Sequence, residues 1–180
     1  MRLISLTLLS QSMNPIEVEI TPEMRSSAAT KANRHGDIKN SLLKGKGNYA
    51  GYLGEEIALA YLTNVEEHNT YKHDMIVRNG DDVYTVEVKT KARTVEPQGF
   101  YSCHVAATSK HQTPDIYIFC SVIVKKSPQR GWVLGWLTRD EFYEKAKFVK
   151  AESEDGNTSF FQKTDAYVVD INQLNPMDEL

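Results

Sequence analysis

The stretch Val83-Tyr84-Thr85-Val86-Glu87-Val88-Lys89 does most to decide the fold, because its residues alternate as those of a β-strand do. Side chains of a strand point alternately to opposite faces, so Glu87 and Lys89 share one face while Val86 and Val88 share the other. An acidic and a basic side chain therefore lie together on a strand whose other residues are typical of a buried hydrophobic core. Burying such charges is costly unless they are paired or hold a metal ion. The strand therefore predicts a charged site at the edge of a core.

A hairpin brings another carboxylate to this strand. We expect its arms at residues 71–78 and 83–91, because Asn79-Gly80 is the strongest short signal for a tight hairpin turn. Asp74 lies on the first arm, so the turn returns it to the side of Glu87.

A helix from Tyr49 to about Leu62 precedes the hairpin. At helical spacing Glu55 falls on the stripe formed by Ala58, Leu59 and Leu62, whereas Glu56 points about 100° away. Glu55 is therefore the acid that we expect to face inward. The glycines of this helix indicate either a close backbone approach or a helix start near Gly54.

The rest of the chain alternates in the same way between helical and strand-like segments. We expect strands at 16–20, 100–107, 115–124, 131–138 and 166–170, helices at 22–34 and 140–149, and a polar connection or one short helical turn at 108–114. The segment 115–124 is almost continuously apolar, as a strand covered on both faces should be, and 166–170 is expected at a sheet edge. This order predicts one α/β domain over residues 16–175, after a disordered leader at 1–15 in which either Met1 or Met13 could be the native start.

Composition narrows the class of protein. A net charge of -3 over 180 residues argues against a strongly cationic binder, although bases outnumber acids between residues 25 and 46. Cys103 and Cys120 lie in apolar, strand-like sequence, which fits a reduced cytoplasmic protein better than a disulfide scaffold. No stretch is long and apolar enough for a membrane span, so we expect no membrane partner.

The predicted cluster suits phosphodiester hydrolysis, which needs a hard cation, a placed water and positive charge at the phosphate. Asp74 and Glu87 can supply carboxylate ligands, the backbone carbonyl of Val88 lies between the site residues, and Glu55 can add a third carboxylate directly or through water. Lys89 can orient or deprotonate the attacking water. The alternative is an ordinary solvated strand face whose charges form salt bridges.

The segments Gly51-Tyr52-Leu53-Gly54-Glu55 and Glu87-Val88-Lys89-Thr90, with Asp74 between them, resemble the signature of the PD-(D/E)XK nuclease superfamily. This superfamily includes type II restriction enzymes and archaeal Holliday-junction resolvases, and the chain also resembles small phage-encoded nuclease-like proteins. The proline often found before the aspartate is replaced here by His73. The expected elements resemble the restriction-endonuclease-like αβββαβ core, a mixed central sheet flanked by helices, at about residues 49–124, with an N-terminal helix and C-terminal strand and helix additions.

The resemblance implies a catalytic set of Asp74, Glu87 and Lys89, with Glu55 as auxiliary acid. It implies Mg²⁺ as cofactor, with Mn²⁺ able to substitute, and it leaves a homodimer open because many members cut two strands as dimers. It also implies the cytoplasm of a bacterial or phage-infected cell as the location.

We expect several polar side chains to contact nucleic acid, although each could equally be an ordinary solvated loop residue. They are Lys44, Lys46, Lys91, Lys110, His111 and Gln112. The expected function is a metal-dependent DNA endonuclease. A non-catalytic DNA-binding module of the same fold and an RNA-directed nuclease remain the alternatives.

Overall fold

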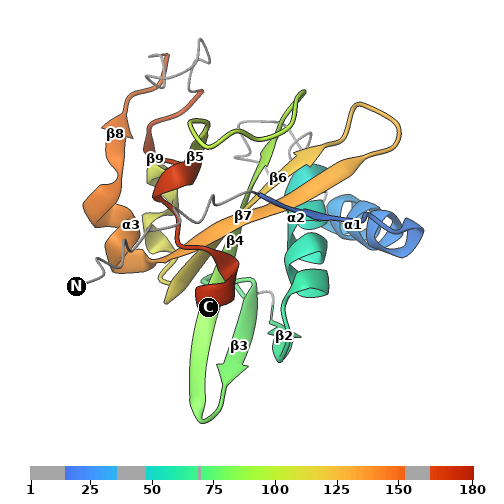
Figure 1. Ribbon diagram of the computed structural model, residues 1–180, viewed down its shortest axis with the longest axis horizontal. Coiled ribbons are helices and arrows are strands. Elements are labelled where there is room, and N and C mark those ends of the chain that lie inside the picture. The colour runs from blue at the N-terminus through green and yellow to red at the C-terminus, as the bar shows by residue number, and fades with distance from the viewer. Residues whose placement is uncertain (1–14, 36–47, 69, 153–162) are drawn as a thin grey trace, which may run out of the picture.

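A six-stranded mixed sheet forms the centre of the computed structural model, which describes residues 15–35, 48–68, 70–152 and 163–180 (Figure 1). In spatial order its strands are β1 (Ile16–Val18), β7 (Arg130–Thr138), β6 (Ile116–Ile123), β4 (Asp82–Ala92), β3 (Met75–Asn79) and β2 (Val65–Glu67). β4 and β6 are parallel, and the other neighbours are antiparallel. The α/β class and the mixed central sheet are thus confirmed.

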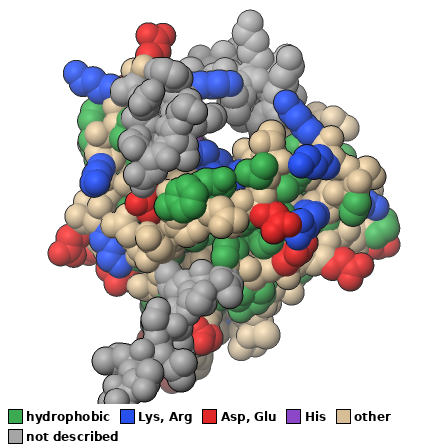
Figure 2. Space-filling model, turned by 45° about the horizontal axis from the view of Figure 1, so that its top comes forward, with side chains coloured by type: hydrophobic (Ala, Val, Ile, Leu, Met, Phe, Trp, Pro, Cys, Tyr) green, Lys and Arg blue, Asp and Glu red, His purple; other side chains and the backbone are tan. Residues whose placement is uncertain are grey.

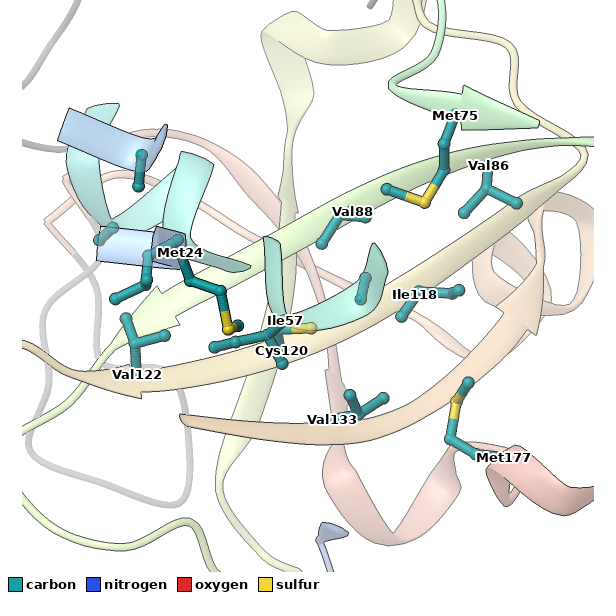
Figure 3. Close-up of a cluster of buried hydrophobic side chains, with 14 of the residues drawn as sticks. Met24, Ile57, Met75, Val86, Val88, Ile118, Cys120, Val122, Val133 and Met177 are labelled. Atoms are coloured by element: carbon teal, nitrogen blue, oxygen red, sulfur yellow. The ribbon is translucent and has the colours of Figure 1, made fainter. Parts of the chain in front are cut away.

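Two helices, α1 (Pro22–His35) and α2 (Asn48–Tyr61), pack together and against one face of this sheet. Figure 3 shows this core, where Ile57 of α2 lies against Val88, Cys120 and other apolar side chains of the strands. A side chain at Gly54 would overlap the hydroxyl of Thr90 on β4, so α2 approaches this strand as closely as a glycine permits. The close approach suggested by the glycines is confirmed, and the helix begins at Asn48, well before Gly54.

The opposite face of the central strands packs against a second, three-stranded sheet in the order β5 (Ser102–Ala106), β9 (Ala166–Asp170), β8 (Lys147–Val149) and against α3 (Arg139–Lys145). Short 3₁₀ turns complete the described parts: η1 (Ala107–His111), η2 (Ile171–Gln173) and η3 (Met177–Glu179). Tyr117 and Phe119 of β6 pack on this side, while Ile118 and Cys120 pack on the helix side. β6 is buried along its whole length, as its apolar sequence predicted.

Three expectations about the elements are wrong. β5 does not extend the central sheet as a third strand of an αβββαβ core but pairs with β9, and β9 is the middle strand of the small sheet rather than an edge. The helix expected at 140–149 ends at Lys145, because the next residues pair with β9 as β8. The hairpin turn expected between the two arms is confirmed, with Asn79 paired with Asp82 around Gly80-Asp81 and Gly80 at a φ of +63°.

The disordered leader expected at residues 1–15 lies, apart from residue 15, outside the described residues. No helix among the described residues is long and apolar enough to cross a membrane.

Candidate active site on the β3–β4 hairpin

The hairpin brings Asp74 and Glu87 together, as the sequence predicted. Met75 pairs with Val86, so Asp74, the residue just before β3, comes opposite Glu87. The Asp74 N–H donates to the carbonyl of Val86 at 3.0 Å, and the Val88 N–H donates to Oδ2 of Asp74 at 2.8 Å. Both the main chain and the side chain of Asp74 are therefore held by β4.

Glu87 is the most confined carboxylate of the site, with 4% of its surface exposed. Its Oε1 accepts hydrogen bonds from Nζ of Lys89 at 2.7 Å and from Nε2 of Gln112 at 2.6 Å. Lys89 also donates to Oε1 of Gln112 at 2.7 Å, so the three side chains form a closed triangle. The other oxygen, Oε2 of Glu87, is buried and has no hydrogen-bond partner among the described residues. A buried carboxylate oxygen without a partner is costly, which makes it the natural position for a positively charged ligand.

Glu55 enters the same electrostatic environment from α2. Burial is the main reason why the pKa of Glu55 is raised to about 8, and the nearby Asp74 and Glu87 raise it further. Burial and then Glu87 raise the pKa of Asp74 to about 7, although the Val88 N–H and Lys89 oppose this shift. The inward orientation predicted for Glu55 is therefore consistent with its burial near these acids. Glu56 points elsewhere and binds Ser27 and Lys31.

The three acids offer only oxygen ligands, the type that Mg²⁺ prefers. Within the described parts of the chain, however, no group of three or more His, Cys, Asp or Glu side chains has the arrangement of a ready metal site. The free Oε2 of Glu87 and the two acids with raised pKa values fit a divalent cation in chemistry and charge. The Val88 carbonyl as a ligand stays a prediction; the Val88 side chain packs in the helix-side core.

The residues expected to contact nucleic acid have different surroundings. Gln112 belongs to the Glu87 triangle, and Nζ of Lys91 donates to Oγ of Ser102 at 2.8 Å, linking β4 to β5. His111 stacks on Tyr71. Lys44, Lys46 and the side chain of Lys110 lie outside the described residues.

Charge is mixed among the described side chains on the face that Figure 2 shows, where Lys and Arg are interspersed with Asp and Glu. This mixture agrees with the net charge of -3.

Sequence reasoning missed the structural role of Gln112 and the position of Tyr71. Gln112 follows a short polar connection without periodicity, and nothing in that stretch indicates that its amide would join Glu87 to Lys89. Tyr71 precedes β3 in a polar stretch, where its spacing gives no information about its partner.

Comparisons with known proteins identify no relative: no protein-family model, no curated protein and no solved structure matches the chain. The functional conclusions rest on the geometry of the Glu55, Asp74, Glu87 and Lys89 cluster.

Proposed function

We propose that this protein is a Mg²⁺-dependent nuclease that hydrolyses phosphodiester bonds within DNA. The observation that carries the proposal is the state of Glu87. One of its oxygens is bonded by Lys89 and Gln112, and the other is buried with no hydrogen-bond partner in the described part of the chain. A strand that served only for stability would gain from an apolar residue here. Such an arrangement is typical of a site that binds a cation and a reacting group.

In this proposal Asp74, Glu87 and the carbonyl of Val88 hold the cation, and Glu55 contributes directly or through a water molecule. Bound Mg²⁺ supplies positive charge at the phosphate oxygens and makes a nearby water more acidic. The raised pKa values of Glu55 and Asp74 support the assignment, because acids crowded in a buried site are stabilised by a cation. Deprotonation of both acids would accompany binding.

Lys89 acts on the attacking water and on the charge that develops at the phosphate. Its ammonium is held at 2.7 Å from both Glu87 and Gln112, so its position is fixed before substrate binds. From there the ammonium can orient the attacking water and donate to a phosphate oxygen. Gln112 is a positioning residue, because it bonds both Lys89 and Glu87.

The test is a digest of linear, supercoiled, single-stranded and four-way-junction DNA, with an RNA of matched sequence, in the presence and absence of Mg²⁺. The wild-type protein should cut DNA only with the metal. Asp74→Ala and Lys89→Ala should lose cleavage while keeping cooperative thermal unfolding. Lys145→Ala is a matched control, since Lys145 belongs to α3 and its Nζ donates to the carbonyl of Gln173 at 3.3 Å.

Full activity of both Asp74→Ala and Lys89→Ala would contradict the proposal. DNA binding without cleavage by the wild-type protein would favour the non-catalytic module. Cleavage of RNA alone would favour the RNA-directed enzyme.

A further inference from the structure

An exposed aromatic pair lies next to the proposed site. Tyr71 is 76% exposed, yet its ring stacks on the imidazole of His111, with ring centroids 4.4 Å apart and ring planes 21° apart. His111 is the last residue of η1, and the next residue, Gln112, bonds Glu87 and Lys89. Tyr71 in turn lies three positions before Asp74. We call these two rings the aromatic shelf. Each ring belongs to a chain segment that leads directly into the proposed site, Tyr71 into Asp74 and His111 into Gln112.

A hydrogen-bonded turn holds Tyr71 outward. The Thr70 N–H donates to the carbonyl of His73 at 2.9 Å, and the Thr70 hydroxyl donates to the same carbonyl at 3.0 Å. This hydroxyl also accepts from the N–H groups of Lys72 at 3.2 Å and His73 at 3.1 Å. The main chain on both sides of Tyr71 is thus fixed although most of its ring is not packed.

The surroundings of this turn and of His111 are fixed as well. The His68 N–H donates to the carbonyl of Asp74 at 2.9 Å. The rings of His68 and His73 stack, and Nδ1 of His68 lies 2.8 Å from Nε2 of His73. On the other side of the shelf, Nδ1 of His111 lies 3.1 Å from the carbonyl oxygen of Thr108. Both rings are therefore preorganised, which lowers the entropic cost of binding a flat ligand.

We propose that the aromatic shelf binds an unpaired nucleobase of the DNA substrate, beside the phosphate to be cut. The inference rests on the proposed function, and it adds the substrate class: DNA with a single-stranded segment, such as a flap, a frayed end or a branch. Aromatic side chains bind single strands by stacking on bases, because every base has a flat face. In an intact duplex these faces are covered by neighbouring bases, so the shelf has no partner there.

The experiment measures binding of the full-length chain, with Ca²⁺ in place of Mg²⁺, to two oligonucleotides that contain 2-aminopurine. One is single-stranded and the other is a duplex of the same length. Stacking quenches 2-aminopurine, so binding of the single strand should lower its fluorescence. Tyr71→Ala should weaken single-strand affinity by about 5- to 100-fold relative to duplex affinity and remove the quenching.

Two variants separate stacking from general damage. Tyr71→Phe keeps the ring and should preserve both affinity and quenching. Phe148→Ala removes another exposed aromatic ring, 49% exposed on β8 of the small sheet, and should behave as wild type. All variants are compared by thermal unfolding.

An equal effect of Tyr71→Ala on both oligonucleotides, or none on either, overturns the inference, as does wild-type binding without quenching. Failure of the proposed function has a different signature. A wild-type protein that never cuts DNA but shows Tyr71-dependent quenching contradicts the nuclease and supports the shelf. A protein that cuts DNA yet shows no Tyr71-dependent preference contradicts the shelf alone.

Discussion

Adjacent glutamates on α2 belong to two charged regions with opposite character. Glu56 lies in the helix cluster, where its Oε1 accepts from Oγ of Ser27 at 2.6 Å and from Nζ of Lys31 at 2.8 Å, and where Lys31 also binds Glu67. Glu55 lies in the acidic cluster with Asp74, Glu87 and Lys89, where burial and like charge raise pKa values.

The difference shows what each region can do. In the helix cluster a cation between two acids links α1, α2 and β2, which is sufficient as a structural role. In the acidic cluster three carboxylates lie near one another, the ammonium of Lys89 pairs with Glu87, and a buried oxygen of Glu87 has no hydrogen-bond partner among the described residues. Proteins retain such unfavourable arrangements where function requires them.

Replacing the lysine of each cluster by methionine, one at a time, should give the largest difference between the two clusters. Lys89→Met removes the group that acts on the attacking water, and we expect DNA cleavage to fall by about 10²- to 10⁴-fold. Lys31→Met removes a cation of the helix cluster and should lower thermal stability while leaving most cleavage. Initial rates in the Mg²⁺ digest and melting temperatures check both. Equal losses of cleavage in the two variants would contradict the distinction.

Stability of the metal-free protein should depend on pH through the acidic cluster. Folding raises the pKa of Asp74 to about 7 and that of Glu55 to about 8. At pH values above the ordinary carboxyl pKa, the folded state therefore binds more protons than the unfolded state. The free energy of unfolding should therefore fall as pH rises from about 5 to about 8, by an amount on the order of 3 kcal/mol.

Urea unfolding in EDTA across this range measures the dependence. Asp74→Asn removes a titrating group and should flatten the curve, while its amide oxygen can still accept from Val88. A wild-type curve that is flat or rises between pH 5 and 8 would show that the acids are not crowded in solution.

Neutralising each glutamate of α2 separately should give changes of opposite sign. Glu55→Gln relieves repulsion in the acidic cluster and should raise the unfolding free energy at pH 8 by about 1 kcal/mol. Glu56→Gln weakens charge-assisted bonds to Ser27 and Lys31 and should lower it by about 1–2 kcal/mol. Both follow from the same urea experiment. Destabilisation by both variants would mean that Glu55 too is bonded for stability.

Alanine substitutions at Gly54 and Gly51 test how closely α2 must approach β4 to present Glu55. Gly54→Ala would force a methyl group against the Thr90 hydroxyl and should cost about 1–3 kcal/mol. Gly51→Ala meets no atom of the described residues within 4 Å and should stabilise the helix by about 0.5–1 kcal/mol. Melting temperatures of the two variants provide the check, and a tolerated Gly54→Ala would show that the helix can move.

The local parts of the fold and site could be predicted because their signals lie close together in the sequence. The Asn79-Gly80 dipeptide indicated the hairpin, and strand alternation placed Glu87 and Lys89 on one face, where they bond. Helical spacing distinguished Glu55 from Glu56. Each of these inferences depends on the spacing of side chains along a helix or strand, or on the residues of a turn, and both can be recognised in a short stretch of sequence.

The wrong predictions all concern partners that lie far away in the chain. Alternation suggested a strand near Ser102, but its pairing with Asp170 in a separate sheet depends on residues much later in the sequence. Phe142, Ala146 and Val149 have helical spacing, yet β9 offers the last of these a strand partner in Ala166. The stacking of Tyr71 on His111 is another long-range contact without a local signal.

Calorimetric titration of Mn²⁺ into the metal-free protein at pH 7.5 tests most directly whether the acidic cluster is a cation site. We predict one binding event per chain whose heat varies with the ionisation enthalpy of the buffer, because Glu55 and the remaining protonated fraction of Asp74 must lose protons. Asp74→Asn should abolish binding, and Glu56→Gln should retain it. No binding by the wild-type protein, or binding unchanged in Asp74→Asn, would contradict the account.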